Sequence, residues 1–231
     1  MRRFYSNNIQ GDHIQLDLEE SRHLVKVLRL KVGDQVEVIN GSTHWYVAEI
    51  MTLDPRACIL RITNKLKSNE NKYGIHLAVA PTKNINRWEW LIEKATEIGV
   101  DQITPIHCKQ SERKVLKVER QERIVIAAAK QSHKIQFPKM FELTAFETIV
   151  KQAEAEEKFI AHCLDEIPRE SLIKLHKASK KVLILIGPEG DFSKEEVNMA
   201  LENGFQSVEL SKSRLRTETA AIVACNTLHN A

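Results

Sequence analysis

Short apolar runs of strand length alternate with helical stretches from Tyr73 to the end of the chain. Parallel strands need a long crossover connection, usually a helix, so this alternation is typical of an α/β fold with a largely parallel sheet. In such a sheet, the loops at the carboxyl ends of neighbouring strands face one crevice, where ligands bind. The expected strands are Ile75–Ala80, Gln102–Ile106, Phe159–His162, Val182–Ile186 and Ser207–Leu210.

The first part of the chain, to about residue 66, carries strand and turn signals of a different kind. Asn40-Gly41 is a strong hairpin signal, and it indicates a small antiparallel β unit. The polar stretch Asn64–Lys72 has no periodicity and indicates a linker. We therefore predict two domains, residues 1–68 and residues 73–231. The expected strands of the first are Gln35–Ile39, His44–Ile50 and Ala57–Ile62.

Two helical stretches carry apolar residues that the fold has to bury. The helix that begins near Ile85 has an apolar face containing Trp88 and stops at Gly99, so we expect its face to be core rather than a cofactor site. The last segment, Thr217–Leu228, is apolar on nearly every side. Such a helix has to be buried, either in the core or between two subunits.

Composition excludes several classes of protein. The longest purely apolar runs are about half a dozen residues, far short of the roughly 20 that span a bilayer, and we expect a cytoplasmic protein. Nine histidines have no ligand spacing, so no metal is expected. The cysteines show no CxxC pair and are expected to be reduced, buried small hydrophobes. They are Cys58, Cys108, Cys163 and Cys225.

A glycine-rich corner follows the predicted strand that ends at Ile186. Ser193 stands three residues before Glu196, which is a capping box, so a helix is expected to begin at about Lys194. Helix N-termini attract anions, yet four acids crowd this turn and make it unsuited to a nucleotide phosphate. Neither GxGxxG nor GxxxxGK[ST] is present. The acids are Glu189, Asp191, Glu195 and Glu196.

A ligand that is neutral or positively charged would fit this corner better, held by backbone groups that Gly187 and Gly190 leave open. S-adenosylmethionine, a sulfonium without phosphate, is such a ligand. The alternative is a tight connection whose acids only complement the helix dipole. A second corner, Ser211–Ala220, links the strand ending at Leu210 to the last helix, and we expect both corners to face one crevice.

Charge is unevenly distributed, although the net charge is only +3. Between Lys109 and Lys139 there are nine Lys or Arg against three acids. Such a run is either a solvated helix face or a nucleic-acid footprint.

Five blocks of the sequence together resemble the RsmE family, and the resemblance runs nearly end to end. Members of that family are methyltransferases of the SPOUT superfamily that modify N3 of a uridine in 16S ribosomal RNA. The blocks are Gly187-Pro-Glu-Gly190, Leu215-Arg-Thr-Glu-Thr-Ala220, Glu89-Trp-Leu-Ile-Glu-Lys-Ala-Thr-Glu-Ile-Gly-Val100, Met1-Arg-Arg-Phe-Tyr5 and His23-Leu-Val-Lys-Val-Leu-Arg29.

The resemblance implies a fold and partners that no spacing argument supplies. It implies a small PUA-like β-barrel for RNA contact, followed by a SPOUT-type α/β domain whose carboxyl-terminal part is tied in a deep trefoil knot. It further implies a homodimer with S-adenosylmethionine bound in the knot, and 16S ribosomal RNA or the assembled small ribosomal subunit as substrate. A dimer interface at the knot helices would account for the apolar last helix.

The resemblance also implies roles for individual residues. Arg216 and Glu218 are the expected catalytic residues, with Glu218 as base and Arg216 as stabiliser of the uracil anion. The expected cofactor contacts are Ile186, Gly187, Glu189, Gly190, Leu210, Ser211, Leu215, Thr217, Thr219 and Ala220. The expected RNA contacts are Arg2, Arg3, His23, Arg29, Lys83 and Lys94, and a plain surface role is the alternative for each.

Three positions depart from the family pattern. Asp191 stands where a second glycine is common, and Lys130 stands where glutamate is frequent. Leu210-Ser-Lys-Ser-Arg-Leu215 replaces the more usual Leu-Gly-x-Arg-Ile-Leu, so Arg214 is expected to take the place of the arginine missing at Ser213.

Methyl transfer from a sulfonium is a one-step displacement, and the protein mainly has to position the acceptor. N3 of uracil carries a proton and lies on the pairing edge, so the base has to be unpaired and deprotonated. Two other functions remain open. One is a non-catalytic RNA-binding dimer with the same barrel and knot, and the other is a nicotinamide dehydrogenase, which the missing GxGxxG disfavours.

Overall fold

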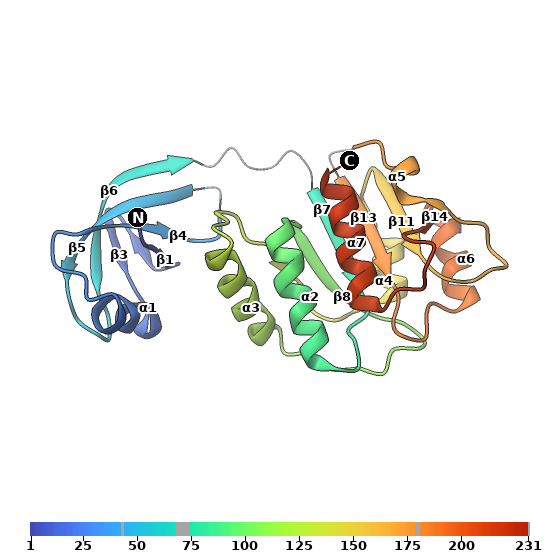
Figure 1. Cartoon of the computed structure of the whole chain (residues 1–231), viewed down its shortest axis with the longest axis horizontal. Coiled ribbons are helices and arrows are strands. Elements are labelled where there is room, and N and C mark those ends of the chain that lie inside the picture. Colours follow the sequence, from blue (N-terminus) through green and yellow to red (C-terminus); the bar gives the residue numbers. More distant parts are fainter. Residues whose placement is uncertain (43, 68–73, 179–180, 231) are drawn as a thin grey trace. The chain divides into compact units, whose positions relative to one another are not determined.

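The computed structural model of the 231-residue chain describes residues 1–42, 44–67, 74–178 and 181–230. The chain divides into two compact units (Figure 1). The first comprises Met1–Glu70 and Ala129–Phe137, and the second comprises Asn71–Ala128 and Pro138–Ala231. We predicted two domains, residues 1–68 and residues 73–231, and these ranges stay predictions. They place the segment Ala129–Phe137 in the second domain, whereas it belongs to the first unit.

The first unit is built on a six-stranded half-barrel sheet in the order β1-β4-β5-β6-β3-β2. Its strand pairs are antiparallel, as predicted, except that β1 runs parallel to β4. A short helix, α1 (Leu18–Arg22), continues into a π-helix, η1 (His23–Val27). The strands are β1 (Arg3–Tyr5), β2 (Ile9–Gln10), β3 (His13–Gln15), β4 (Gln35–Ile39), β5 (His44–Thr52) and β6 (Ile59–Lys67).

The predicted linker is wrong in its first part. Asn64–Lys67 continue strand β6 and pair with β5. This end of the strand is largely exposed, so it needs no apolar periodicity. The rest of that stretch, residues 68–72, lies outside the described residues. Elsewhere the strands show the alternation expected of a half-buried sheet: Val36 and Val38 of β4 and Ala48 and Ile50 of β5 lie in one core.

Phe137 connects the segment Ala129–Phe137 to this sheet. Its backbone N–H donates to the Gly41 carbonyl oxygen at 3.1 Å, and its ring stacks on Tyr5 with centroids 5.5 Å apart. Gly41 has a positive φ of 76°, and a Cβ there would lie 2.7 Å from Cδ2 of Phe137. Position 41 therefore requires glycine for two reasons, its backbone conformation and the ring that covers it.

Two further contacts hold the same segment. Lys130 forms an ion pair with Glu20, whose side chain is buried. The Arg3 guanidinium donates to the His133 carbonyl oxygen at 2.6 Å and to the Glu37 carboxylate at 2.8 Å. Lys130, one of the departures from the family pattern, thus has a partner that explains its charge.

The second unit is an α/β fold on a parallel sheet in the order β10-β8-β7-β13-β11-β14-β12, with β9 also paired to β8. Every strand pair in it is parallel, as the sequence predicts. The strands are β7 (Gly74–Val79), β8 (Gln102–His107), β9 (Lys139–Met140), β10 (Thr144–Ala145), β11 (Glu157–Ala161), β12 (Glu170–Ser171), β13 (Lys181–Ile186) and β14 (Gln206–Glu209). The helices are α2 (Ile85–Ile98), α3 (Val118–Gln131), α4 (Phe146–Lys151), α5 (Leu172–Leu175), α6 (Lys194–Glu202) and α7 (Thr217–Asn230).

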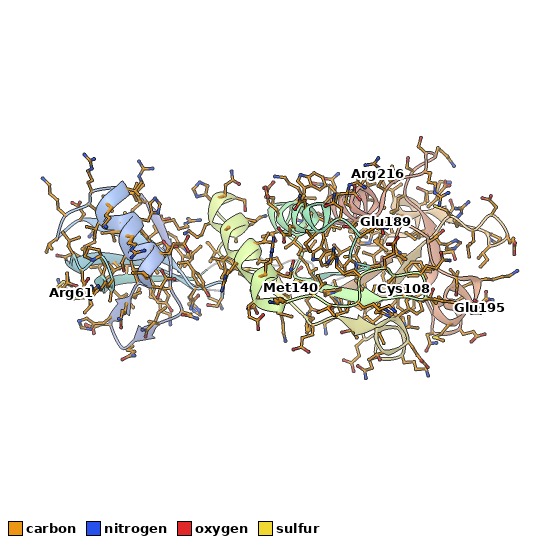
Figure 2. All side chains as sticks on the ribbon, turned by 90° about the horizontal axis from the view of Figure 1, so that it is seen from below. Arg61, Cys108, Met140, Glu189, Glu195 and Arg216 are labelled. Atoms are coloured by element: carbon orange, nitrogen blue, oxygen red, sulfur yellow. The ribbon has the colours of Figure 1, made fainter. Side chains whose placement is uncertain are left out.

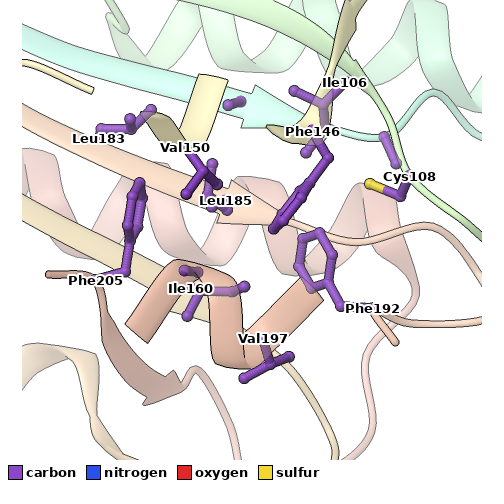
Figure 3. Close-up of a cluster of buried hydrophobic side chains, with 13 residues drawn as sticks. Ile106, Cys108, Phe146, Val150, Ile160, Leu183, Leu185, Phe192, Val197 and Phe205 are labelled. Carbon is purple, nitrogen blue, oxygen red and sulfur yellow. The ribbon is translucent and has the colours of Figure 1, made fainter. Parts of the chain in front are cut away.

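Strand β13 lies at the centre of this sheet, and all residues from Val182 to Ile186 are buried, as expected of a strand covered on both faces. On one face, α4 and α6 enclose an aromatic and aliphatic cluster in which Phe146 and Phe192 lie with ring centroids 5.3 Å apart (Figure 3). Helices α2 and α7 pack against each other, and α7 also contacts β7 and β13.

Helix α7 is buried in part in the core, and burial of the rest between two subunits stays a prediction. Ala221, Ala224 and Cys225 are buried, while Ile222 and Val223 are partly exposed in the chain as described. The cysteines are unpaired, but the prediction that all are buried is wrong for Cys163, which is exposed. It follows the end of β11, where the chain leaves the sheet for a surface loop.

Candidate functional site

The glycine-rich corner has the predicted local structure. Strand β13 ends at Ile186, and α6 begins at Lys194 with Ser193 as its N-cap. The Glu196 backbone N–H donates to Ser193 Oγ at 3.3 Å, and the Ser193 N–H donates to Glu196 Oε2 at 2.8 Å, which completes the capping box. Ile186 and Gly187 are buried, whereas Glu189 and Gly190 are exposed.

Asp191 is in the left-handed region with a φ of 67°. This conformation explains why glycine is common at the position. Here the aspartate carboxylate compensates: Oδ1 accepts from the Phe192 N–H at 2.8 Å, and Oδ2 accepts from the Cys163 N–H at 2.7 Å. Asp191 therefore fastens the corner to the loop after β11.

Thr217 joins the two predicted corners. It is the first residue of α7, and its buried Oγ1 donates to the Gly187 carbonyl oxygen at 3.1 Å. The corner after β13 and the corner after β14 are thus adjacent at the carboxyl edge of the sheet, as expected. Leu210, Leu215 and Ala220 of the second corner are partly buried, and the polar or charged members are exposed. These are Ser211, Arg216 and Thr219.

A third loop, Cys108–Arg113 after β8, belongs to the same edge, and the sequence reasoning missed it. The Lys109 N–H donates to Glu196 Oε1 at 2.8 Å, and a Cβ on Gly190 would clash with Gln110 Oε1. Its position at the carboxyl end of a predicted strand was the available signal. The Arg113 guanidinium fixes the neighbouring loop by donating to the Thr82 and Lys83 carbonyl oxygens.

The four acids of the corner all have partners within the protein. Glu189 Oε1 accepts from the Lys83 N–H at 2.9 Å, and Glu195 Oε2 lies 3.2 Å from the Lys109 ammonium. Glu196 and Asp191 bind backbone N–H groups, as described above. These acids hold loops together, and their role in excluding phosphate stays a prediction.

The two predicted catalytic residues lie in different surroundings. Glu218 is 7% exposed, and within the described chain its Oε2 has no hydrogen-bond partner. Its Oε1 lies 3.7 Å from Nε of Arg87, a residue of α2 that the sequence reasoning did not select. Arg216 is exposed in the loop just before α7, in the same unit as Glu189 (Figure 2).

The predicted RNA contacts also differ from one another. Arg2 and Arg29 are exposed, and Arg29 has a positive φ of 53°. His23 is half-buried against Phe4, with ring centroids 6.0 Å apart. The guanidinium of Arg3 is engaged by Glu37, as described above, and is therefore less available to a phosphate.

The two predicted lysine contacts have acidic neighbours. The Lys83 ammonium lies 2.8 Å from Glu112, whose hydrogen bond raises the lysine pKa. The Lys94 ammonium lies 2.8 Å from both Glu93 and Glu97. The positive charge of each lysine is therefore partly offset by these neighbouring carboxylates.

A cavity of about 300 Å³ lies in the first unit, and none of the predicted site residues lines it. Across residues 1–42, 44–67, 74–178 and 181–230, no three His, Cys, Asp or Glu side chains are grouped so that they could hold a metal ion. In the same ranges, each helix is too short or too polar to pass through a bilayer. The cavity is lined by Tyr5, Ser6, Asn7, Asn8, Gln15, Leu16, Asp17 and Arg56.

Comparison with known families agrees with this geometry. The RNA methyltransferase domain family matches residues 69–229, which include all three loops of the carboxyl edge. The chain belongs to this RNA methyltransferase family. A second family, the RNA methyltransferase PUA domain, matches residues 16–63 in the first unit.

Individual relatives of this RNA methyltransferase confirm the resemblance to the RsmE family. The Buchnera aphidicola protein named ribosomal RNA small subunit methyltransferase E is 31% identical over 221 residues, which cover 91% of this chain and 85% of the relative. The probable rRNA-methyltransferase from Porphyromonas gingivalis is 38% identical, with a TM-score of 0.93, and the match covers 99% and 97% of the two chains.

A further solved structure, from Legionella pneumophila, is in complex with the bound cofactor SAM. It is 30% identical to this chain, with a TM-score of 0.87, and the match covers 98% of this chain and 96% of that one. Both family membership and the two-part α/β and PUA-like organisation are therefore established.

Proposed function

We propose that this protein transfers a methyl group from S-adenosylmethionine to N3 of one uridine, uracil-1498, in 16S ribosomal RNA. The observation that carries the proposal is the bond between Thr217 and Gly187, which joins two loops at the carboxyl edge of a parallel sheet. The relative from Buchnera aphidicola, named a small-subunit ribosomal RNA methyltransferase, and the Legionella pneumophila structure with SAM support the same reaction.

The residues at this edge fit a sulfonium cofactor. Gly190 is exposed and keeps its backbone accessible, and the buried carboxylate of Glu218 lies on the first turn of α7, beside Thr217. When bound, the cofactor supplies an electrophilic methyl group. The residues proposed to hold it are Ile186, Gly187, Glu189, Gly190, Leu210, Ser211, Leu215, Thr217, Thr219 and Ala220.

The chain's own side chains have to make N3 of uracil nucleophilic. Glu218 accepts the N3 proton, and Arg216 stabilises the negative charge that forms on the base. The buried position of Glu218 suits a base, because few competing waters reach it. Arg216 is exposed, as a group that meets a large RNA substrate has to be.

RNA recognition is assigned mainly to the first unit and to the basic run Lys109–Lys139. The exposed Arg2 and Arg29 contribute phosphate contacts, while His23, Arg3, Lys83 and Lys94 contribute less because each is half-buried or paired. The domain ranges proposed for these roles are 1–68 and 73–231. We place the protein in the cytoplasm. Its substrate there is either naked ribosomal RNA or the assembled small ribosomal subunit.

The trefoil knot is part of the proposal. Strand β14 lies beyond β11, yet the following α7 returns to pack on α2 and β7. Its first residue meets the loop after β13, so the chain end passes close to that loop. An experimental density map traced through residues 187–193 and 211–230 tests whether the end is threaded through it.

The homodimer is proposed from apolar side chains on α2 and α7 that the single chain leaves partly exposed. Ile222 and Val223 are partly exposed and Trp90 is 44% exposed. Sedimentation equilibrium is expected to show a dimer that Ile222→Glu converts to monomer. A wild-type monomer at micromolar concentration would contradict the dimer.

Methyl transfer itself is tested with tritiated S-adenosylmethionine and small ribosomal subunits that lack the modification. We expect label in a single 3-methyluridine. Calorimetry is expected to show saturable cofactor binding that is weakened in Gly190→Ala, a variant whose nearest new contact is the flexible end of Gln110. No heat of cofactor binding, together with no transfer to RNA, would favour a non-catalytic RNA-binding dimer instead.

A further inference from the structure

Arg87 lies in the first turn of α2, which begins after the N-cap Asn84. Its Nε is 3.7 Å from Oε1 of Glu218, slightly too long for a hydrogen bond but close enough for an ion pair. The two residues are far apart in the sequence, and α2 and α7 bring them together. The Glu218 side chain is 10% exposed and that of Arg87 is 41% exposed, so the pair joins a buried carboxylate to a more exposed guanidinium.

Only one oxygen of the Glu218 carboxylate has a partner among the described residues. Oε2 is buried and accepts no hydrogen bond from the described residues. Leaving a buried carboxylate oxygen unpaired costs free energy, and most proteins avoid it. A negative charge near the start of α7 is favourable for the helix dipole, but that role does not require burial. The unpaired oxygen can therefore accept a hydrogen bond from a bound substrate.

We infer that Arg87 is a positioning residue that holds Oε1 of Glu218 and leaves Oε2 directed at the reacting uracil. This inference rests on the proposed function. In the reaction, the N3 proton passes to Oε2 while the N3 electron pair forms the new bond to the methyl carbon. The carbon–sulfur bond breaks with its electron pair on sulfur, and Glu218 later releases its proton to solvent.

The chain offers a matched control for this arginine. Lys151 of α4 forms a cation–glutamate ion pair outside the proposed site, its Nζ lying 2.6 Å from Oε1 of Glu147. Lys151→Gln therefore removes an ion pair from the same unit without touching Glu218 or the basic run Lys109–Lys139. Arg87→Lys keeps a positive charge near Oε1 but loses the planar guanidinium.

The test measures single-turnover methyl transfer to small ribosomal subunits, cofactor affinity by calorimetry and thermal unfolding for each variant. We expect Arg87→Gln to lower the transfer rate about 10- to 100-fold, with cofactor affinity and unfolding temperature close to wild type. Arg87→Lys is expected to recover part of the rate, and Lys151→Gln to retain all of it. Arg87→Gln combined with Glu218→Gln should be no slower than Glu218→Gln alone.

Additive losses in the double variant would overturn the inference, because Arg87 would then act independently of Glu218, for example on RNA phosphates. A loss explained by reduced cofactor affinity or unfolding temperature would also overturn it. Absence of any transfer by the wild-type protein would instead contradict the proposed function. Normal transfer by Arg87→Gln would leave that function intact and remove only this inference.

Discussion

Thr217 Oγ1 donates a hydrogen bond to the Gly187 carbonyl oxygen across 3.1 Å, and both residues are buried. Gly187 belongs to the loop after β13 and Thr217 to the start of α7. This one bond therefore fixes the spacing of the two loops that we propose to bind the cofactor. Because the donor is a side chain, the bond can be removed without changing the backbone.

Thr217→Val is expected to lower the free energy of unfolding by about 1 kcal/mol and to weaken cofactor binding. Valine has the shape of threonine but leaves the Gly187 carbonyl oxygen unpaired. Urea unfolding and calorimetry measure the two effects. Thr227→Val on the same helix is the control and should change neither quantity. Unchanged cofactor affinity in Thr217→Val would show that the loop spacing does not depend on this bond.

Asp191→Ala is expected to be more destabilising than Asp191→Gly. Alanine loses both carboxylate hydrogen bonds and keeps a Cβ at a φ of 67°, which costs about 1 kcal/mol more than glycine. Asp191→Asn keeps an acceptor and tolerates this conformation, so it should be nearest to wild type. Urea unfolding ranks the three variants. An alanine variant as stable as the glycine variant would contradict the backbone argument.

Lys130→Met is expected to destabilise the protein by about 3 kcal/mol at pH 7, because it leaves the Glu20 carboxylate buried without its cation. Burial raises the pKa of Glu20 above 4.5, and Lys130 opposes that shift. The folded state therefore binds the proton more tightly than the unfolded state, and stability falls as pH rises through the raised pKa.

Without Lys130 the pKa of Glu20 rises further, so the destabilisation should shrink as pH falls from 7 toward 4.5. Denaturant unfolding at several pH values follows this. Lys130→Arg is the control because it keeps the charge. A cost for Lys130→Met that is the same at every pH would show that Glu20 is not the cause.

His76 is expected to make the protein acid-sensitive. Burial lowers its pKa to about 4, and its Nε2 lies 2.7 Å from the Thr104 hydroxyl. Between pH 6.5 and pH 4 the unfolded chain binds a proton that the folded chain does not, so stability falls as pH falls. The loss from this residue between pH 7 and pH 5 is about 2 kcal/mol. Urea unfolding should show a smaller loss in His76→Gln, and an equal loss would contradict the assignment.

Local patterns in the sequence were sufficient to predict the helices and strands that carry the candidate site. The capping box of Ser193 and Glu196 is written within four residues, and Gly99 ends α2 with a φ of 110°. The parallel sheet follows from alternating runs, because burial on both faces demands continuous apolar residues. Such features depend on neighbours in the chain, so a single sequence contains them.

Pairings between distant residues could not be predicted. Arg87 meets Glu218, and Lys130 meets Glu20, only because tertiary packing brings their elements together. The charge of a residue does not identify its ion-pair partner, because the chain has 34 Lys and Arg and 31 Asp and Glu to choose from. The partners of the acids in the glycine-rich corner could not be predicted either. Their number suggested repulsion of phosphate, whereas each has a nearby donor or cation that no local pattern identifies.

The seating of Phe137 on Gly41 has a consequence for how such proteins can evolve. A recombination event that exchanged only residues 1–70 would carry Gly41 and Glu20 into a new chain without Phe137 and Lys130, their partners in the segment Ala129–Phe137. The amino-terminal part of the first unit is therefore not freely exchangeable between proteins. Its inheritance is coupled to a short segment, Ala129–Phe137, that lies much later in the sequence.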